Sequence, residues 1–155
     1  MKPAAWRVRP ASSADLEAIF ALEQACAEAP HWSRAAWLAA LSQEPPAVPA
    51  RVVFVADNKL ALLGFAVGIC AGRFAELESV AVSAPARRQG VGKALCRQII
   101  DWSKQVGAHT VELEVRASSE GALALYRSLG FQEQGRRPGY YRNPTEDAVL
   151  MAARV

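Results

Sequence analysis

The chain has 155 residues, a net charge of +3 and a pI of about 9.0, with 52% hydrophobic and 21% charged residues. This length and balance are typical of one globular domain with a single core, and we expect residues 1–155 to form it. They exclude a disordered chain, a coiled coil and a collagen-like chain. The mild basic excess suits a small anionic ligand, and alone it is too weak to indicate nucleic-acid binding.

The chain has no pattern typical of a membrane or secreted protein. Its longest apolar run, residues 60–70, is interrupted by Gly64 and Gly68. That run is shorter than the roughly 20 residues that cross a membrane. Residues 1–9 lack the apolar segment of a secretory signal. We therefore expect a cytoplasmic protein.

The cysteines and histidines are few and widely spaced. They lack the spacing of a disulfide framework or a metal site, so we expect neither. These residues are Cys26, Cys70, Cys96, His31 and His109.

The N-terminal third predicts a short strand followed by two helices. Residues 6–9 read as the strand. Ser12 or Ser13 can cap the first helix and Ser33 the second. A proline-rich loop is expected at residues 43–50. The apolar positions of the first helix are Leu16, Ile19, Phe20 and Leu22. Those of the second are Trp37, Leu38 and Leu41.

The middle of the chain changes to the period of strands. Apolar and β-branched segments predict an antiparallel meander of strands at residues 51–56, 60–70 and 76–82, with the first turn at 57–59. Residues 90–106 then return to helical periodicity and end at a glycine. The apolar stripe of this helix is Leu95, Ile99, Trp102 and Val106.

The C-terminal third predicts a strand at residues 110–115, a helix at 120–129 and strands at 131–137 and 148–152. The whole order predicts an α+β domain with a mixed, mostly antiparallel sheet of about seven strands flanked by about four helices. The strand at 76–82 and the strand at 110–115 are joined by a helix. We therefore expect them to lie parallel, with a right-handed crossover.

The turn that follows the strand at 76–82 is typical of an anion-binding helix start. Helix N-termini present unpaired N–H groups and a positive dipole end. Gly90 and Gly92 leave the backbone open to a ligand, and Arg87, Arg88 and Lys93 add positive charge. A helix start on a basic surface, with no ligand, would show the same residues.

Two common phosphate-binding motifs do not fit this turn. A Walker A loop requires a glycine where Arg87 stands and a hydroxyl where Ala94 stands. A Rossmann fingerprint requires a third glycine at the position of Leu95.

The same turn carries a family resemblance. Arg87-x-x-Gly90-x-Gly92 after a Val-Ala-Val strand resembles the acetyl-CoA pyrophosphate motif of the GNAT superfamily of N-acetyltransferases. The chain is most similar to its ribosomal-protein-alanine N-acetyltransferases (RimI type), and the likeness covers nearly the whole chain. The further segments that carry it are 113–118, 124–131, Trp32-Ser33, Tyr140-Tyr141 and 146–148.

The resemblance implies a GNAT fold and acetyl-CoA as cosubstrate, with Glu114 as general base and Tyr126 as general acid. It also places pantetheine on one strand and pyrophosphate on the turn. Ser119 stands where the family has an asparagine, and a hydroxyl offers fewer donors than an amide. The implied cofactor-binding residues are Val80, Ala81, Val82, Arg87, Arg88, Gln89, Gly90, Val91, Gly92, Lys93 and Ser119.

The implied acceptor is the N-terminal α-amine of a ribosomal protein, with no nucleic acid or membrane as direct partner. Acetyl transfer needs a neutral amine, and an α-amine titrates near pH 8 against about 10.4 for lysine, so a modest base suffices for an N-terminus. A tyrosine is protonated at pH 7 and can donate to the leaving thiolate. The alternatives are a small-molecule amine as acceptor, or a catalytically silent acyl-CoA-binding regulatory domain.

Several of these residues also have an ordinary structural interpretation. Glu114 could be a solvent-exposed carboxylate on a half-buried strand, and Tyr126 a tyrosine at the edge of the core. Glu76, which shares a strand face with Glu78, is a second candidate base. Cys96 reads as a small buried thiol. Four residues could line an acceptor groove or form a solvated loop: Arg136, Arg137, Tyr140 and Tyr141.

Overall fold

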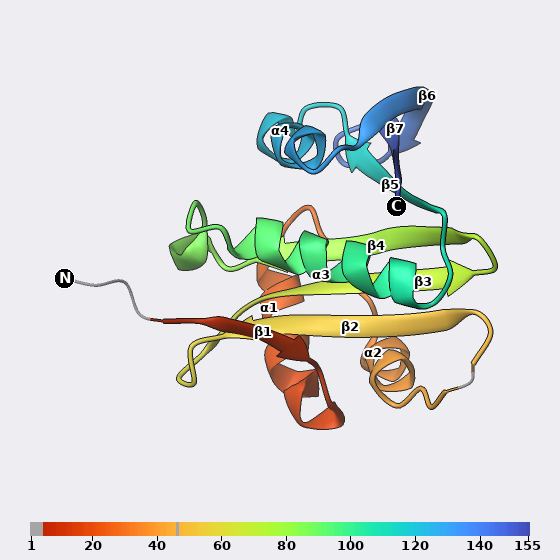
Figure 1. Ribbon diagram of the computed structural model, residues 1–155. Helices are drawn as coiled ribbons and strands as arrows, with labels where there is room; N and C mark the ends of the chain where they lie inside the picture. Colours follow the sequence, from red (N-terminus) through yellow and green to blue (C-terminus); the bar gives the residue numbers. More distant parts are fainter. Residues whose placement is uncertain (1–4, 46) are drawn as a thin grey trace.

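The computed structural model describes residues 5–45 and 47–155 (Figure 1). In this part of the chain seven strands form one sheet in the order β1-β2-β3-β4-β5-β7-β6. The strands are β1 (Arg7–Pro10), β2 (Ala50–Asp57), β3 (Leu62–Ala71), β4 (Phe74–Val82), β5 (Thr110–Arg116), β6 (Gln132–Tyr141) and β7 (Glu146–Arg154). The helices are α1 (Leu16–Ala25), α2 (Arg34–Leu41), α3 (Val91–Gln105) and α4 (Glu120–Ser128), with short 3-10 turns η1 (Ser13–Asp15) and η2 (Ala84–Ala86).

The pairing of the strands confirms the predicted mixed, mostly antiparallel sheet. β4 and β5 are parallel, as expected for strands joined by α3. Every other neighbouring pair is antiparallel within the described residues. The fold class and the order of elements therefore agree with the prediction.

β4 and β5 stay paired over a short distance only. Their ladder joins Phe74 to Thr110 and ends at Glu76 and Glu112, although both strands continue. Against β3, Val67 pairs with Ser79 and Gly68 with Leu77, so Glu78 is an extra residue in β4. Such a bulge bends its strand. The bend accompanies a separation of β4 from β5, which leaves one edge of β4 without a strand partner.

The bulge also exchanges the two faces of β4. Before it, Ala75 and Leu77 belong to the core cluster beneath α3. After it, Val80 and Val82 pack on that same cluster, and Ala81 turns to the cluster beneath α1 and α2. The even-numbered side chains at the end of β4 thus face the side of the sheet that carries α3.

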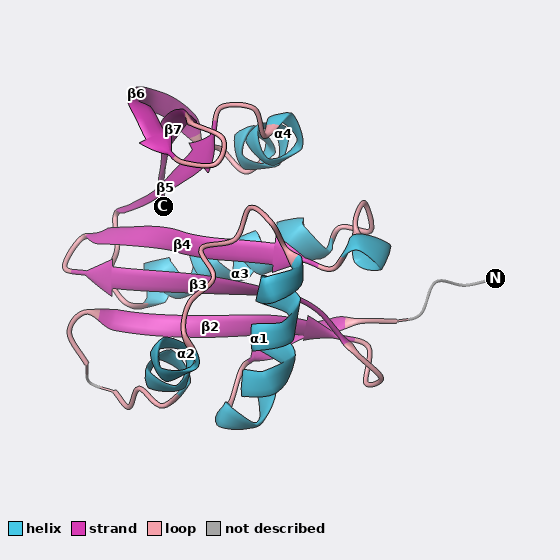
Figure 2. Cartoon of the chain, turned by 180° about the vertical axis from the view of Figure 1, so that it is seen from behind, coloured by secondary structure: helices cyan, strands magenta, loops and turns pink. Residues whose placement is uncertain are grey.

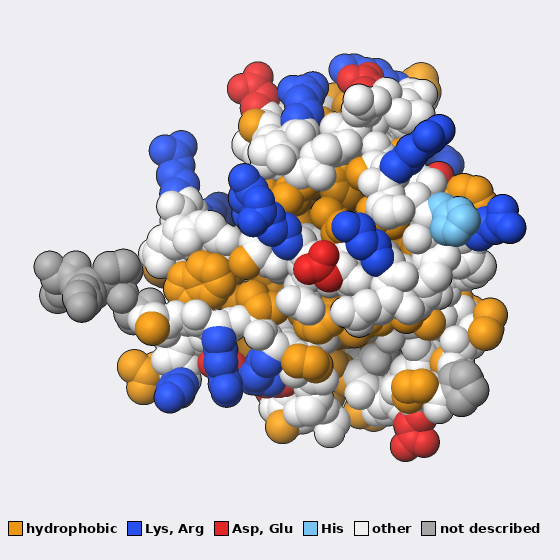
Figure 3. Space-filling model, in the orientation of Figure 1, with side chains coloured by type: hydrophobic (Ala, Val, Ile, Leu, Met, Phe, Trp, Pro, Cys, Tyr) orange, Lys and Arg blue, Asp and Glu red, His pale blue; other side chains and the backbone are white. Residues whose placement is uncertain are grey.

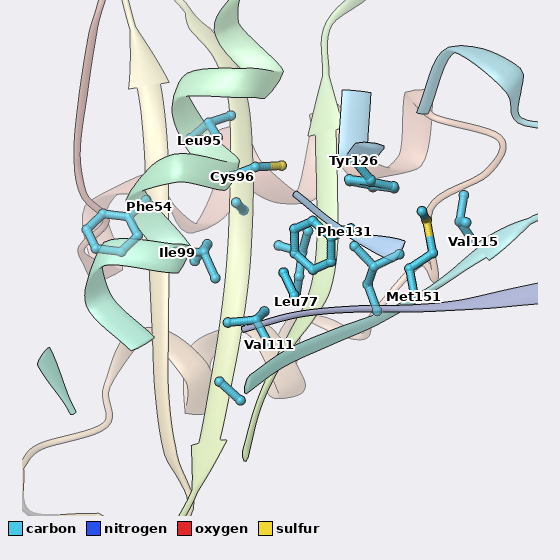
Figure 4. Packing of buried hydrophobic residues seen from close by; sticks show 14 of the residues in the cluster. Phe54, Leu77, Leu95, Cys96, Ile99, Val111, Val115, Tyr126, Phe131 and Met151 are labelled. Atoms are coloured by element: carbon cyan, nitrogen blue, oxygen red, sulfur yellow. The ribbon is translucent and has the colours of Figure 1, made fainter. Parts of the chain in front are cut away.

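The helices lie on both faces of the sheet. α3 covers one face, and α1 and α2 cover the other (Figures 1 and 2). Leu95 and Ile99 of α3 point into the core together with Leu77 and Val111 (Figure 4). α3 lies close to β3, because a Cβ added at Gly64 or Gly68 would come within about 3.1 Å of α3 side chains.

The helix starts agree with the prediction in one case of two. Ser33 caps α2, since its Oγ accepts the Ala36 N–H at 3.1 Å. Ser12 precedes η1 instead of α1, and its N–H donates to the Asp15 carboxylate at 2.9 Å. The first α-helix therefore begins only at Leu16.

The prediction of the apolar helix faces is wrong for some side chains. Leu38 is 47% exposed and Val106 is 41% exposed, so neither is a core residue. Phe20 agrees with the prediction, because it is partly buried against the core cluster, and it lies beneath the Arg34 guanidinium at 4.3 Å. Residue spacing gives the centre of a helix's packing face but not its width. Residues at the edge of that face, or just beyond the end of the helix, are therefore exposed.

Several strand boundaries differ from the predicted ones. The Asn58 side chain accepts the N–H groups of Leu60 and Ala61, which holds them in a turn and delays β3 to Leu62. β6 and β7 are longer than predicted, at 132–141 and 146–154. The predicted loop at 43–50 ends one residue early because β2 begins at Ala50, and Pro46 lies outside the described residues.

Among the helices that the structure describes, none is long and apolar enough to cross a membrane.

Candidate active site

A cavity of about 760 Å³ lies where β4 and β5 separate. Its walls come from six segments of the chain, including the α1–α2 loop, α4 and the end of β6. Apolar side chains lie in the hollow between α3 and α4, with Lys and Arg side chains around it (Figure 3). The lining residues are 26–30, 76–82, Arg87, 113–116, Ser119, Ala122, Leu125, Tyr126, Tyr140 and Tyr141.

The predicted anion-binding turn lies at one end of this cavity. Gly90 is the N-cap of α3 and adopts φ 83°, while Arg88 adopts φ 62°, so the turn uses left-handed backbone twice. The Ala94 N–H donates to the Gly90 carbonyl at 3.0 Å. The N–H groups of residues 91–93 precede this bond and have no carbonyl acceptor within their own helix.

The side chains of the turn leave its backbone open. The Val91 side chain is buried in the core, so it does not cover these N–H groups. A Cβ at Gly92 would meet Val82 and Leu125 at 3.5 and 3.6 Å, on the wall of the cavity. Arg87 Nε donates to the Val82 carbonyl at 3.3 Å, which ties the turn to the end of β4.

The structure brings only part of the predicted cofactor set to the cavity wall. Val80, Ala81, Val82, Arg87 and Ser119 line it. The rest of the turn, residues 88–93, lies beyond that wall, at the start of α3. The Gln89 side chain donates to the Pro85 carbonyl at 3.1 Å and so stabilises the turn itself.

Tyr126 lies both in the core and on the cavity wall. It is 7% exposed, and its ring packs edge-on against Phe131 at 5.9 Å (Figure 4). Burial raises the pKa of its hydroxyl well above the ordinary value, with smaller contributions from Cys96, Tyr141 and Glu28. The hydroxyl is therefore protonated throughout the physiological pH range.

Glu114 lies on β5, and its side chain pairs with a side chain of β6. Its carboxylate is 26% exposed and lies 3.3 Å from Arg137 Nε. Hydrogen bonding to Glu114 is the main cause that raises the pKa of the Tyr140 phenol, and the Arg137 guanidinium lies 5.6 Å from the Tyr140 ring centre. Glu114 is thus a partly buried carboxylate in a polar cluster, and not a freely solvated one.

Glu76 and Glu78 also line the cavity, but their surroundings differ. Glu78 is paired with Arg51 through two hydrogen bonds of 2.9 and 3.0 Å. The pKa of Glu76 is raised, first by burial and then by repulsion from Glu78, Glu114 and Glu112. Glu76 therefore still competes with Glu114 as a base.

The groove formed by the end of β6 is partly as predicted. Tyr140 and Tyr141 line the cavity, and their rings meet edge-on at 5.1 Å. Burial is the main cause that raises the pKa of Tyr141 to about 12. Arg137 contacts Glu114, whereas Arg136 pairs with Glu133 at the surface.

The sequence gives no signal for one wall of the cavity. Residues 26–30 of the α1–α2 loop line it, yet they have neither the period of a helix nor that of a strand. Ser119 Oγ lies 3.4 Å from Glu28 Oε2, so this loop reaches the start of α4. The sequence gives no indication of this contact, because Glu28 and Ser119 lie 91 residues apart.

Two further predictions concern the Cys96 thiol and metal binding. Cys96 is buried, and burial raises the pKa of its thiol to about 12. Within residues 5–45 and 47–155, no group of three or more His, Cys, Asp and Glu side chains is arranged to hold a metal ion.

The chain is similar to known acetyltransferases in sequence and in structure. Residues 16–131 match the Acetyltransferase (GNAT) family. The ribosomal protein bS18-alanine N-acetyltransferase of Escherichia coli (strain K12) is 48% identical over 82 residues, 50% of this chain and 54% of that protein. N-alpha-acetyltransferase RimI of Mycobacterium tuberculosis is 40% identical over 76 residues, 49% of this chain and 46% of that protein. The sequence match therefore spans about half the length of these curated relatives.

Solved structures extend the likeness to nearly the whole chain. The crystal structure of the ribosomal-protein-S18-alanine N-acetyltransferase from Escherichia coli has a TM-score of 0.83 and 32% identity, over 97% of this chain and 94% of that one. Arabidopsis thaliana NAA60 in complex with acetyl-CoA has a TM-score of 0.85 at 17% identity, over 97% and 99%, and shares the fold. The family match covers most of the sequence, and we conclude that the chain belongs to the GNAT family of acetyltransferases.

Proposed function

We propose that the chain is an acetyl-CoA-dependent N-acetyltransferase that modifies the N-terminal α-amine of a ribosomal protein. The observation that carries this proposal is the meeting of Glu114 and Tyr126 in one cavity, which extends along the unpaired edge of β4 to Arg87. The names of the relatives from Escherichia coli support the choice of a ribosomal acceptor.

The residues present fit acetyl-CoA. The unpaired N–H groups at the start of α3 and the positive end of its dipole suit a pyrophosphate, and Gly92 leaves space beside them. The edge of β4 from Leu77 to Val82 offers backbone donors and acceptors to an extended amide-containing arm. Acetyl-CoA supplies an acetyl thioester, whose carbonyl carbon is the electrophile.

On this proposal, Glu114 accepts the proton that the acceptor amine loses as its nitrogen bonds to the acetyl carbon. Arg137 and Tyr140 hold the carboxylate in place. Glu76 is the alternative base, because it lines the same cavity and its pKa is raised. An α-amine is already neutral in roughly a tenth of molecules at pH 7, so a modest base is sufficient.

Tyr126 serves the other half of the transfer. The bond between the acetyl carbon and sulfur breaks, and the sulfur leaves as a thiolate. The Tyr126 hydroxyl, kept protonated by burial, can donate a hydrogen bond or its proton to that sulfur. No cysteine–histidine pair is needed, since the amine attacks the thioester directly.

The test is a panel of acceptors incubated with acetyl-CoA and followed by mass. The panel holds peptides with the N-terminal sequences of ribosomal proteins, the same peptides with blocked α-amines, and polyamines, amino acids and aminoglycosides. We expect free N-terminal peptides to gain one acetyl group and the blocked ones to gain none. Acetylation of the small amines alone would contradict the proposed acceptor.

A further inference from the structure

Glu23, near the end of α1, is a fully buried carboxylate that the proposed mechanism does not use. Its side chain has no exposed surface. Oε1 accepts two hydrogen bonds, from the Trp32 N–H at 2.7 Å and from Trp37 Nε1 at 2.9 Å. Oε2 is buried without a hydrogen-bond partner in the described part of the chain. A carboxylate in this setting is unfavourable for stability, because a buried charge needs a cation or a full set of donors.

Both bonds of Glu23 fix the segment that follows α1. The segment leaves α1 at Ala25 and returns to the same carboxylate at Trp32, so Glu23 closes it into a loop. Trp32 packs against Trp37 at 4.8 Å, and Trp37 against Phe65 of β3 at 5.1 Å. The returning end of the loop is therefore anchored on the sheet.

A second anchor joins the same loop to the bulge of β4. The Arg51 guanidinium lies 5.4 Å from the Trp32 ring centre and forms the bidentate pair with Glu78. Glu78 is the extra residue of the bulge and lines the cavity. Glu23 thus holds Trp32 by its backbone N–H, and Arg51 contacts its ring.

The part of the loop between the end of α1 and Trp32 lines the cavity, at residues 26–30. α1 and α2 lie on the face of the sheet opposite α3 (Figure 2). The proposed pyrophosphate site is at the start of α3. The loop therefore approaches the cavity from the other face, where an acceptor can enter without crossing the cosubstrate.

We propose that Glu23 is a positioning residue that sets the acceptor side of the cavity by holding the α1–α2 loop. This rests on the proposed function. In the described part of the chain, the two N–H groups that it binds donate to no other protein acceptor. Loss of the carboxylate would leave the Trp32 and Trp37 donors unsatisfied, and the loop would move to hydrate them.

The test compares Glu23→Leu and Glu23→Gln with wild type in steady-state kinetics. Leucine removes both acceptor bonds, so we expect the KM for a peptide acceptor to rise about tenfold or more. Glutamine keeps a carbonyl acceptor for both donors, and we expect it to restore the KM to within about threefold of wild type. The KM for acetyl-CoA should rise by no more than about threefold in either variant, because the loop reaches the implied cosubstrate site only where Glu28 lies 3.4 Å from Ser119.

Glu17 provides matched controls on the same helix. Its carboxylate is exposed and pairs with Arg34, and neither residue lines the cavity. Glu17→Leu and Glu17→Gln should therefore keep the wild-type KM values. An unchanged peptide KM in Glu23→Leu, or an equal rise in both KM values, would overturn the positioning role.

Amide hydrogen exchange gives a second readout that does not depend on activity. Glu23→Leu should speed exchange in residues 26–33, and Glu17→Leu should not. If Glu23→Leu fails to fold, Trp37→Phe removes the indole donor together with part of a buried ring, and should still raise the peptide KM about threefold with a smaller change in the acetyl-CoA KM. Unchanged loop exchange or an unchanged KM in that variant would reject the proposal. A wild-type protein that acetylates no peptide would contradict the proposed function, and the exchange result would still decide the role of Glu23 in holding the loop.

Discussion

The cavity pairs a carboxylate that is held by polar neighbours with a phenol that is kept neutral by burial. Glu114 is fixed by Arg137 from β6, while Tyr126 is fixed by the core of the molecule. Burial keeps the Tyr126 hydroxyl protonated, while the Glu114 carboxylate faces the same cavity. One residue can therefore accept a proton while the other donates.

Replacement of Tyr126 by phenylalanine tests the proposed role of its hydroxyl as a donor. The variant keeps the ring that packs on Phe131 and loses only the hydroxyl. We expect kcat to fall by about 100-fold, because donation to the leaving sulfur is lost. Calorimetric titration should show acetyl-CoA binding close to wild type. An equal loss of turnover and binding would show that the hydroxyl serves structure or ligand contact instead.

The direction of the Tyr126 pKa shift adds a check with pH. Because burial raises the pKa, the hydroxyl stays protonated at higher pH than an ordinary tyrosine. Wild-type kcat should therefore show no decline caused by Tyr126 ionisation up to about pH 10. A falling limb below that pH that disappears in Tyr126→Phe would contradict the assignment.

The location of residues at the cavity was predictable where a local motif carried them. The glycines of the α3 start are two residues apart, and Glu114 and Tyr126 lie in segments that resemble a known family. The contacts of Glu114 with Arg137, and of Glu28 with Ser119, join residues far apart in the chain. Such pairs depend on how strands and loops come together, which residue spacing does not encode.

At the scale of elements, β3 shows how composition controls packing. Gly64 and Gly68 interrupt the apolar run of this strand and leave the space that α3 occupies. A Cβ at Gly64 would lie 2.7 Å from the Ala81 carbonyl oxygen and 3.1 Å from Leu95 Cδ1. Because the first contact is with backbone, a small rotation of one side chain cannot relieve it.

Gly64→Ala should therefore destabilise the fold by about 1–3 kcal/mol through overpacking. Gly121→Ala is the matched control, because a Cβ there meets nothing within 4 Å and α4 gains a better helix former. Urea unfolding should show a lower midpoint for Gly64→Ala and an equal or higher one for Gly121→Ala. A Gly64→Ala protein as stable as wild type would show that β4 yields easily at Ala81.

The elements themselves were mostly predictable, and the bulge in β4 was not. Hydrophobic period identified every strand and helix, with errors at their ends. The apolar residues on the α3 side change from odd to even positions across Glu78, from Ala75 and Leu77 to Val80 and Val82, but Ala81 between the last two hides this change in the sequence. Yet this residue accompanies the bend that opens the cavity. The separation of β4 from β5 arises from strand pairing, which is a tertiary property.

At the scale of the whole molecule, the proposed function places the two substrates on opposite faces of the sheet. The start of α3 and the basic residues near it lie on one face, and the α1–α2 loop lies on the other (Figures 1 and 2). The gap between β4 and β5 joins the two sides at Glu114 and Tyr126. The modest net charge of +3 is thus less informative than the position of Arg87, Arg88 and Lys93 around one helix start.

On the proposed function, this cavity transfers an acetyl group to a protein α-amine. Tandem mass spectrometry of one acceptor tests it most directly, with a ribosomal-protein peptide that carries a free N-terminal alanine and an internal lysine. After incubation with acetyl-CoA, the fragment ions should place the acetyl group on the alanine nitrogen. An acetyl group on the lysine Nζ, or none on the peptide while small amines are acetylated, would contradict the account.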